Sequence, residues 1–405
     1  MTETLDAPPL AGATHITDYD EISEILRSPD FVQGGFAEGT AEMIPGALIT
    51  LNGRAHVERR RLFARMFTQD RVDHYIEHGI LPETRSALAE LRAAGTDETD
   101  LVPLSWRILH RVPAMVVGID VDPDAEVRGR FVRYIREIAK AVTVDWQRGD
   151  HGALLAAGKA AKTRFAEEFF APSLAARRDL VERHRRGEIA AEELPIDVVT
   201  VLLLHGDVPD EVMLHEAVGF LMASITTTAQ AFPHFVVQLE DWLARHPQRR
   251  SVVQDIGFLQ RAVDESLRLF VAAPARIRTA TKDLVLKCSG RRIAQGQKLA
   301  LWFGPANASP DFGADTEHFD PEREVRARPD WGLAFGAGAH LCIGRPIVTG
   351  VRGRGADPAP HGTMASLAKA LYAAGLELVA DAPATKDAGT FYDEYASLPV
   401  RFTDL

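Results

Sequence analysis

The stretch FGAGAHLCIG, residues 335 to 344, places one cysteine in a loop of small residues. Cys342 follows His340 by two positions, and the glycines on either side allow the backbone to close around the sulfur. A thiolate is a strong ligand for iron, and nearby backbone N–H groups tune its electron donation. The stretch therefore predicts a thiolate iron ligand. The alternative is a glycine-rich turn with an inert cysteine.

Length and composition set limits on the class of protein. With 405 residues, of which 46% are hydrophobic, the chain can bury a large core. Two cysteines, Cys288 and Cys342, are too few for a disulfide framework, which favours a cytoplasmic location. The first ten residues lack an apolar segment, and no apolar run approaches a membrane span, so we expect a soluble protein without an anchor. The net charge of −11 disfavours nucleic acid as a partner.

Amphipathic helices separated by short Gly/Pro turns account for most of the sequence. No internal repeat or low-complexity linker interrupts it, so we expect one domain over residues 1–405. The fold class is mainly α with small β-sheets, an α+β arrangement. Helices are expected at residues 19–28, 55–67, 81–93, 124–142, 161–186, 211–244 and 364–374. Short strands are expected at residues 284–287, 299–302 and 398–402.

The cysteine loop resembles the haem-ligand loop of the cytochromes P-450. That loop has the pattern Phe, Gly, spacer, Gly, spacer, His, spacer, Cys, spacer, Gly. All of its fixed positions are met, by Phe335, Gly336, Gly338, His340, Cys342 and Gly344. The resemblance implies a cytochrome P-450 fold. It also implies haem b bound between the long central helix and this loop, with Cys342 on the iron.

Two further motifs stand in the family's order. VDESLRLF contains Glu265 and Arg268, three residues apart and so on one helix face, and FDPER ends at Arg323. The resemblance implies that these three residues form a buried charge network behind the haem. A guanidinium fork holds a carboxylate through two bonds, which fixes one arrangement even where the net stabilisation is small.

The two haem propionates need cations or hydrogen-bond donors around them. By resemblance these are His56, Arg60, Arg278 and His340; His56 and Arg60 lie four residues apart on one expected helix face. Arg276, two residues before Arg278, leaves open which guanidinium points inward.

The expected helix 211–244 contains ASITTT, which resembles the family's oxygen-activation stretch. Ala223 and Thr227 fit the pattern, whereas Ser224 replaces a glycine and Thr226 replaces the acid. The resemblance assigns Thr227 and Thr226 to catalysis. The alternative is a threonine cluster that makes bonds within the helix. Pro233 is expected to bend the helix.

Two departures from the family are expected. Much of the amino-terminal helix and leading strand is predicted to be absent. After Arg345 and Pro346, the segment IVTGVRGRGADPAPHG stands where a typical member has a long helix. Its prolines and glycines predict that no regular helix forms there. The segment also carries arginines that, with others near residue 60, predict a docking patch for an acidic redox partner: Arg59, Arg60, Arg61, Arg65, Arg345, Arg352 and Arg354.

The resemblance implies a monooxygenase that inserts one atom of O2 into a small or medium apolar organic molecule. Electrons are expected from NAD(P)H through a reductase and a separate ferredoxin or flavodoxin. An H2O2-driven peroxygenase and a non-catalytic haem sensor or carrier remain alternatives. Without the resemblance, a cysteine hydrolase using Cys342 and His340 also remains. The expected substrate-pocket residues are Met43, Ile44, Leu221, Ala223, Ile225, Val271, Ala272, Ala273 and Phe391.

Overall fold

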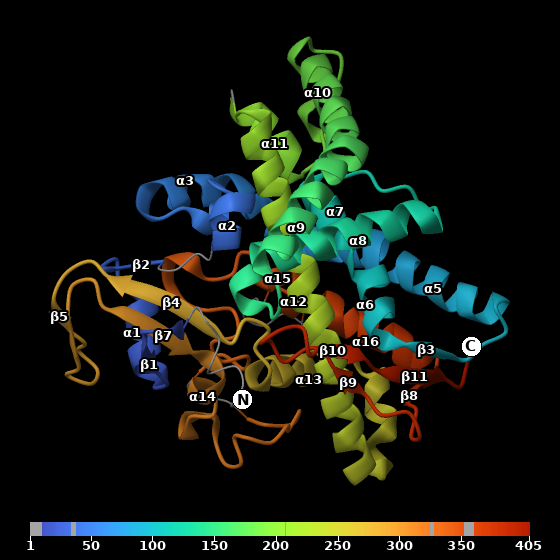
Figure 1. The fold of residues 1–405 in the computed structure, drawn as a ribbon. Helices are drawn as coiled ribbons and strands as arrows, with labels where there is room; N and C mark the ends of the chain where they lie inside the picture. Colours follow the sequence, from blue (N-terminus) through green and yellow to red (C-terminus); the bar gives the residue numbers. More distant parts are fainter. Residues whose placement is uncertain (1–9, 34–37, 207, 325–327, 352–359) are drawn as a thin grey trace.

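A body of helices carries small sheets at its sides (Figure 1). The computed structural model describes residues 10–33, 38–206, 208–324, 328–351 and 360–405. The helices are α1 (Tyr19–Arg27), α2 (Glu38–Met43), α3 (Gly53–Phe63), α4 (Gln69–Tyr75), α5 (Leu81–Ala93), α6 (Leu101–Leu109), α7 (Arg111–Val117), α8 (Ala125–Val142), α9 (His151–Phe165), α10 (Ala171–Arg185), α11 (Val198–His205), α12 (Asp210–Arg245), α13 (Ile256–Leu269), α14 (Phe303–Asn307), α15 (Arg345–Thr349) and α16 (Thr363–Ala373).

The strands form one four-stranded sheet, one three-stranded sheet and two hairpin-like pairs, in the orders β1-β7-β4-β2, β3-β11-β8, β5-β6 and β10-β9. Their bounds are β1 (Thr14–Ile16), β2 (Phe31–Gln33), β3 (Glu98–Asp100), β4 (Ala275–Ala280), β5 (Leu284–Val285), β6 (Arg292–Ile293), β7 (Lys298–Trp302), β8 (Leu376–Leu378), β9 (Thr385–Lys386), β10 (Tyr395–Ser397) and β11 (Pro399–Phe402). The mainly helical fold class is confirmed.

Helix α12 crosses the centre of the body and supplies much of the largest core cluster (Figure 1). It runs 36 residues and continues through Pro233, so the proline does not end the helix. By length and composition alone it could cross a membrane, which corrects the expectation that no apolar run approaches that length. In this fold 56% of its most apolar window is buried, as expected of a core helix.

The sequence located α5 at both ends and α12 to within one residue at each end. Residues 161–185 are helical, as predicted, through the end of α9, one π-helical turn (Ala166–Phe170) and α10, but the prediction missed that α9 begins ten residues earlier, at His151. Asp150 caps that start by accepting a hydrogen bond from the Ala153 N–H. At Gly158 an added Cβ would lie 2.1 Å from the Ala141 Cβ, so small residues let α9 pack closely on α8. The same small residues weakened the amphipathic pattern.

A short strand stands ahead of α1, so part of the leading strand is present. Strand β1 pairs in parallel with β7, with Thr14 opposite Leu299 and Ile16 opposite Leu301. The strand has only three residues, so its alternation is too short to stand out in the sequence. It completes the sheet that also contains β4, which carries the candidate arginines.

The segment after Cys342 differs in part from the prediction. Its first residues, Ile347 to Thr349, complete the short helix α15 and are therefore helical. The helix ends at Gly350, which has φ +68°, and an added Cβ there would lie 2.8 Å from the carbonyl carbon of Pro360. Gly353, Gly355, Pro358, Arg352 and Arg354 lie outside the described residues.

Candidate active site

The backbone of the cysteine loop directs donors toward Sγ of Cys342. The Cys342 N–H donates to the Phe335 carbonyl at 2.9 Å, which closes the loop. The backbone N–H groups of Gly344 and Arg345 point at the sulfur and favour its thiolate, although burial is the larger effect and raises the pKa of the thiol. The sulfur is enclosed by protein, and its accessible surface faces an internal cavity. It can therefore bind a group in that cavity.

Two glycines shape this loop in different ways. Gly336 and Gly338 both have φ +69°, a conformation that favours glycine. An added Cβ on Gly338 would lie 2.1 Å from the Leu26 carbonyl oxygen, whereas one on Gly336 would meet no atom within 4 Å. Gly338 therefore also allows the loop to pack against α1.

The cavity has a volume of about 660 Å³ and lies between the cysteine loop, α12 and the end of β4. It brings together most of the predicted site residues, which come from distant parts of the sequence. Those that line it are Ile44, His56, Arg60, Ala223, Thr226, Thr227, Val271, Ala272, Ala273, Arg278, Phe335, Gly336, His340, Cys342 and Gly344.

The pocket prediction is wrong for four residues. Met43, Leu221 and Ile225 are at most 1% exposed and pack in the main core. Phe391 packs against the core group around Trp302, with the Arg148 guanidinium 4.2 Å from its ring centre. Apolar character alone does not show whether a side chain packs in the core or lines the cavity, because both use the same residue types.

Four predicted propionate-binding residues form one cluster. The rings of His56 and His340 lie 4.0 Å apart between centres, and Gln33 Nε2 is 3.0 Å from His340 Nδ1. Burial and neighbouring cations, including Arg60, lower the pKa of both histidines, that of His340 to about 4. Burial also lowers the pKa of Arg278 to about 10. The histidines are thus neutral donors beside two guanidinium cations.

Arg276 and Arg278 both line the cavity, which answers the question left open by the sequence. They are two residues apart on β4 and therefore share one face of the strand. Arg276 keeps a large accessible area although protein encloses it, because its side chain extends into the cavity.

These residues fit a haem. His56 Nδ1 is buried without a hydrogen-bond partner in the described structure, as a donor reserved for a ligand would be. The thiol of Cys342 faces the same cavity as the cations of Arg60 and Arg278, so an iron ligand and two carboxylate partners converge there. His340 bonds Gln33, and no hydrogen bond joins it to Cys342 in the part of the chain that the structure describes. That geometry does not support a cysteine hydrolase.

The threonines of α12 bond within the helix. The hydroxyls of Thr226 and Thr227 donate to the carbonyls of Met222 and Ala223, at 2.6 and 2.8 Å. Thr228 does the same toward Ser224 at 2.7 Å. The helix-internal bonds are therefore present, and both Thr226 and Thr227 also line the cavity. A hydroxyl that donates to a carbonyl can still accept a hydrogen bond from a ligand or water.

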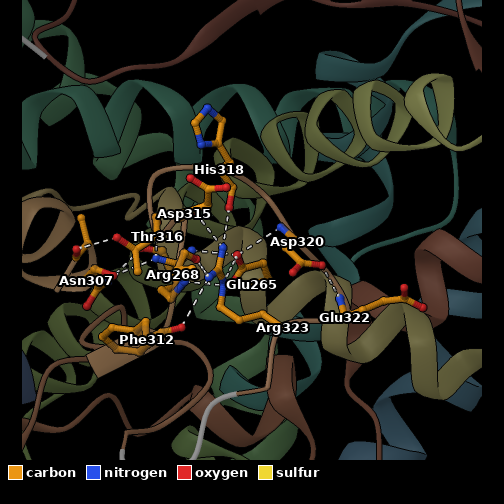
Figure 2. Close-up of polar contacts among 12 residues, drawn as sticks. Glu265, Arg268, Asn307, Phe312, Asp315, Thr316, His318, Asp320, Glu322 and Arg323 are labelled. Carbon is orange, nitrogen blue, oxygen red and sulfur yellow. Dashed lines mark hydrogen bonds and ion pairs between the residues drawn. The ribbon is translucent and has the colours of Figure 1, made fainter. Parts of the chain in front are cut away.

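Glu265, Arg268 and Arg323 come together in a buried network (Figure 2). Arg268 Nε and Nη2 each donate to the Glu265 carboxylate at 2.7 Å, and Arg323 Nε donates at 3.0 Å. Arg268 is 0% exposed and Glu265 is 4% exposed. The remaining donors of both arginines reach loop carbonyls, so the network joins α13 to residues 307–323.

Asn307 links this network to the chain that enters the cysteine loop. Its Nδ2 donates to the Arg268 carbonyl at 2.9 Å, and its Oδ1 accepts from the Leu333 N–H at 2.7 Å. An added Cβ at Gly332 would collide with Asn307, so the glycine permits this approach. The network therefore holds the start of the loop that carries Cys342.

Sequence reasoning missed the polar part of the cavity. Gln230, Tyr392 and Glu394 line it, as do Arg136 and Lys140 from α8. The sequence offered one signal, since Gln230 follows Thr227 by one helical turn and therefore lies on its face. Tyr392 and Glu394 gave no such signal in the sequence, because tertiary packing alone brings them to the cavity.

The helical body, the thiolate loop and the Glu–Arg–Arg network define a haem-thiolate protein of the cytochrome P-450 class. A family model described as cytochrome P-450 matches residues 245–349. The chain belongs to the cytochrome P-450 family, whose members are oxidoreductases.

Named relatives agree with this assignment. The chain is 26% identical over 347 residues to the mycinamicin IV hydroxylase/epoxidase of Micromonospora griseorubida, covering 82% of this chain and 77% of that protein. It is also 26% identical over 315 residues to the 6-deoxyerythronolide B hydroxylase of Saccharopolyspora erythraea, covering 77% and 69%. The crystal structure of CalO2 matches 97% of this chain and 91% of its own, with a TM-score of 0.72 at 20% identity, which supports the fold.

Proposed function

We propose that this protein is a haem-thiolate monooxygenase that inserts one oxygen atom of O2 into a small or medium organic substrate. The observation that carries the proposal is the Cys342 thiol, with two backbone N–H groups aimed at it, facing the cavity that Thr227 also lines. The hydroxylase relatives support the reaction class. A thiolate-ligated haem supplies the electron donation that favours O–O cleavage.

The chain's own residues bind and orient this cofactor. Cys342 is the iron ligand, and the Gly344 and Arg345 amides moderate its donation. Arg60 and Arg278 balance the propionate charges, while His56 and His340 donate as neutral rings. Helix α12 forms the opposite wall and excludes bulk water, leaving the Thr227 hydroxyl to hold a proton donor or water near the reacting oxygen.

Electrons are proposed to come from NAD(P)H through a reductase and a small ferredoxin or flavodoxin. Arg61 and Arg65 are exposed and suit an acidic partner. Arg59 is less suitable, because it is bonded to Glu216 at 2.6 Å. The described residues contain two cysteines, both free, which is compatible with the proposed cytoplasmic location.

The test is the absorption spectrum of the reduced, carbon-monoxide-bound protein. The wild type should give the red-shifted band of a thiolate-ligated haem, and Cys342→Ala should lose it. Cys288→Ser is the matched control, because Cys288 is exposed beside β5, where partial burial and the Glu24 carboxylate raise its pKa to about 11. A thiolate band that persists in Cys342→Ala would overturn the ligand assignment.

Turnover assays separate the alternatives. Because Thr226 stands in place of an acid, a peroxide-driven reaction is the second candidate. Product from O2 with NAD(P)H, reductase and ferredoxin or flavodoxin supports the monooxygenase. Product from H2O2 alone supports the peroxygenase, and ligand-dependent spectra without product from either support a carrier or sensor.

A further inference from the structure

The charged residues of the cavity wall are only partly balanced. Glu216 accepts a bond from Arg59 at 2.6 Å. The carboxylate of Glu394 lies in the field of two cations of α8, Lys140 and Arg136, which counteract part of its pKa elevation. Asp387 stands beside Glu394, so this corner holds two carboxylates and two cations. In both regions, cations and carboxyl groups therefore lie together.

Three arginines of the cavity have no such balance: Arg60, Arg276 and Arg278. Within residues 10–33, 38–206, 208–324, 328–351 and 360–405, no carboxylate lies in ion-pair distance of any of them. Burial lowers the pKa of each, which reflects the cost of holding a cation in this setting. An enclosed guanidinium without a counter-charge is strongly unfavourable unless a ligand supplies the anion.

A haem supplies two of the three anions. The porphyrin dianion and the thiolate together offset the charge of ferric iron, so the two propionates are the remaining negative groups. Two propionates pair with two guanidinium groups. One arginine is left over, and neutral histidines do not change this balance.

The arginine left over is Arg276. Arg278 stands opposite Gln33 in the sheet, and Gln33 bonds His340. Arg60 lies one helical turn after His56, so both arginines adjoin the histidine cluster. Arg276 is not among the groups that shift the pKa of His340; it lies near Tyr392 and, as Arg60 also does, near the cysteine. Tyr392 is held in place by stacking on Trp146, with ring centres 5.1 Å apart and planes at 15°. Arg276 stands two residues away along β4, opposite Leu301, and so is further from Gln33 and the histidine cluster than Arg278 is.

We infer that the substrate carries an anionic group, a carboxylate or similar oxyanion, and that the Arg276 guanidinium binds it. Two parallel N–H bonds to a carboxylate would orient the substrate, and the Tyr392 hydroxyl can add a third donor. This inference rests on the proposed function and refines its substrate, because the sequence alone predicted an apolar molecule. Apolar walls such as Val271 and Phe303 remain for the rest of that molecule.

The test uses probes that anchor on the iron whatever the natural substrate is. These are ω-imidazolyl alkanoic acids with chains of four to twelve carbons, each compared with the ω-imidazolyl alkanol of equal length. Imidazole binding shifts the haem absorption and gives a Kd. At the best length the wild type should bind the acid about tenfold or more tightly than the alcohol. Equal affinity for acid and alcohol at every length would overturn the inference.

Variants assign the preference to one residue. Arg276→Gln should keep its haem and lose the preference for the acid, and Arg276→Lys should recover part of it. Arg136→Gln, which removes a cavity cation elsewhere, should keep the preference. Arg278→Gln should instead lose haem, and the same loss in Arg276→Gln would assign Arg276 to a propionate and overturn the inference. Failure of the wild type to give the thiolate spectrum would instead reject the proposed function itself.

Discussion

The side chain of Gln230 on α12 donates a hydrogen bond to the Glu394 carboxylate, with 2.5 Å between Nε2 and Oε1. Both residues line the cavity, and Gln230 follows Thr227 by three positions. Burial, followed by the charge of Asp387, raises the pKa of Glu394 to about 7. The cavity therefore contains a carboxyl group whose charge changes near neutral pH.

This group makes stability depend on pH. Its pKa in the folded protein is above the ordinary value for a glutamate, so the folded state binds the proton more tightly than the unfolded state. The stabilising contribution is complete below the unfolded pKa and is lost as pH rises through about 7. Between about pH 5 and pH 8, Tm should therefore fall more in the wild type than in Glu394→Gln. Equal falls in the two proteins would show that Glu394 titrates normally.

The two glycines of the cysteine loop allow a matched test of packing against backbone strain. Both have φ +69°, so Gly336→Ala and Gly338→Ala each add strain of about 1–2 kcal/mol. Only Gly338→Ala also places a Cβ 2.1 Å from the Leu26 carbonyl oxygen. It should lower the free energy of unfolding and the haem content well below those of Gly336→Ala. Similar values for both variants would mean that α1 moves aside without cost.

The Glu265 network predicts a large loss of stability from one truncation. Glu265→Ala leaves Arg268, which is fully buried, without its carboxylate, and should cost about 3–5 kcal/mol in chemical denaturation. Glu322→Ala is the control, because the Arg249–Glu322 pair is 40% and 45% exposed and should contribute at most about 1 kcal/mol. An equal, small effect of both changes would contradict the account of a network that supports the loop.

The sequence predicted the cysteine loop, the histidine and arginine cluster and the central helix because each is marked by residues at fixed spacing. It could not place Met43, Leu221 and Ile225 correctly, since helix position alone does not tell a core face from a cavity face. It also missed Glu394, which reaches the cavity from a hairpin far along the chain. Its partner Gln230 becomes significant only once that hairpin is in place.

Glycine content was informative in some places and misleading in others. Gly350 ends α15, as the run of glycines and prolines suggested, although the helix still forms up to Thr349. The expected helix 161–186 left out the first ten residues of α9, where Gly158 is needed because α8 approaches too closely for a side chain. Whether a glycine ends a helix or allows close packing depends on the helix beside it, which the sequence pattern does not show.

The threonines of α12 give the sharpest test of the reaction. Thr226 and Thr227 make equivalent bonds to carbonyls four residues back, at 2.6 and 2.8 Å, and both line the cavity. Replacing either by Val keeps the shape and removes one hydroxyl bond, so each variant should lose a similar stability, about 1 kcal/mol. Adjacent positions on a helix point about 100° apart, so at most one of the two hydroxyls can face the reacting oxygen squarely.

If Thr227 positions the proton donor, Thr227→Val should lower product formed per NAD(P)H consumed and raise peroxide release, with substrate binding little changed. Thr226→Val should do this to a smaller extent, since a hydroxyl at that place cannot serve as the acid that Thr226 replaces. Coupling and peroxide release measured in both variants, beside their Tm values, separate this role from a structural one. Full coupling in Thr227→Val would show that the threonine serves the helix alone and that protons arrive by another route, for which Glu394, bonded to Gln230 on the same helix, is a candidate.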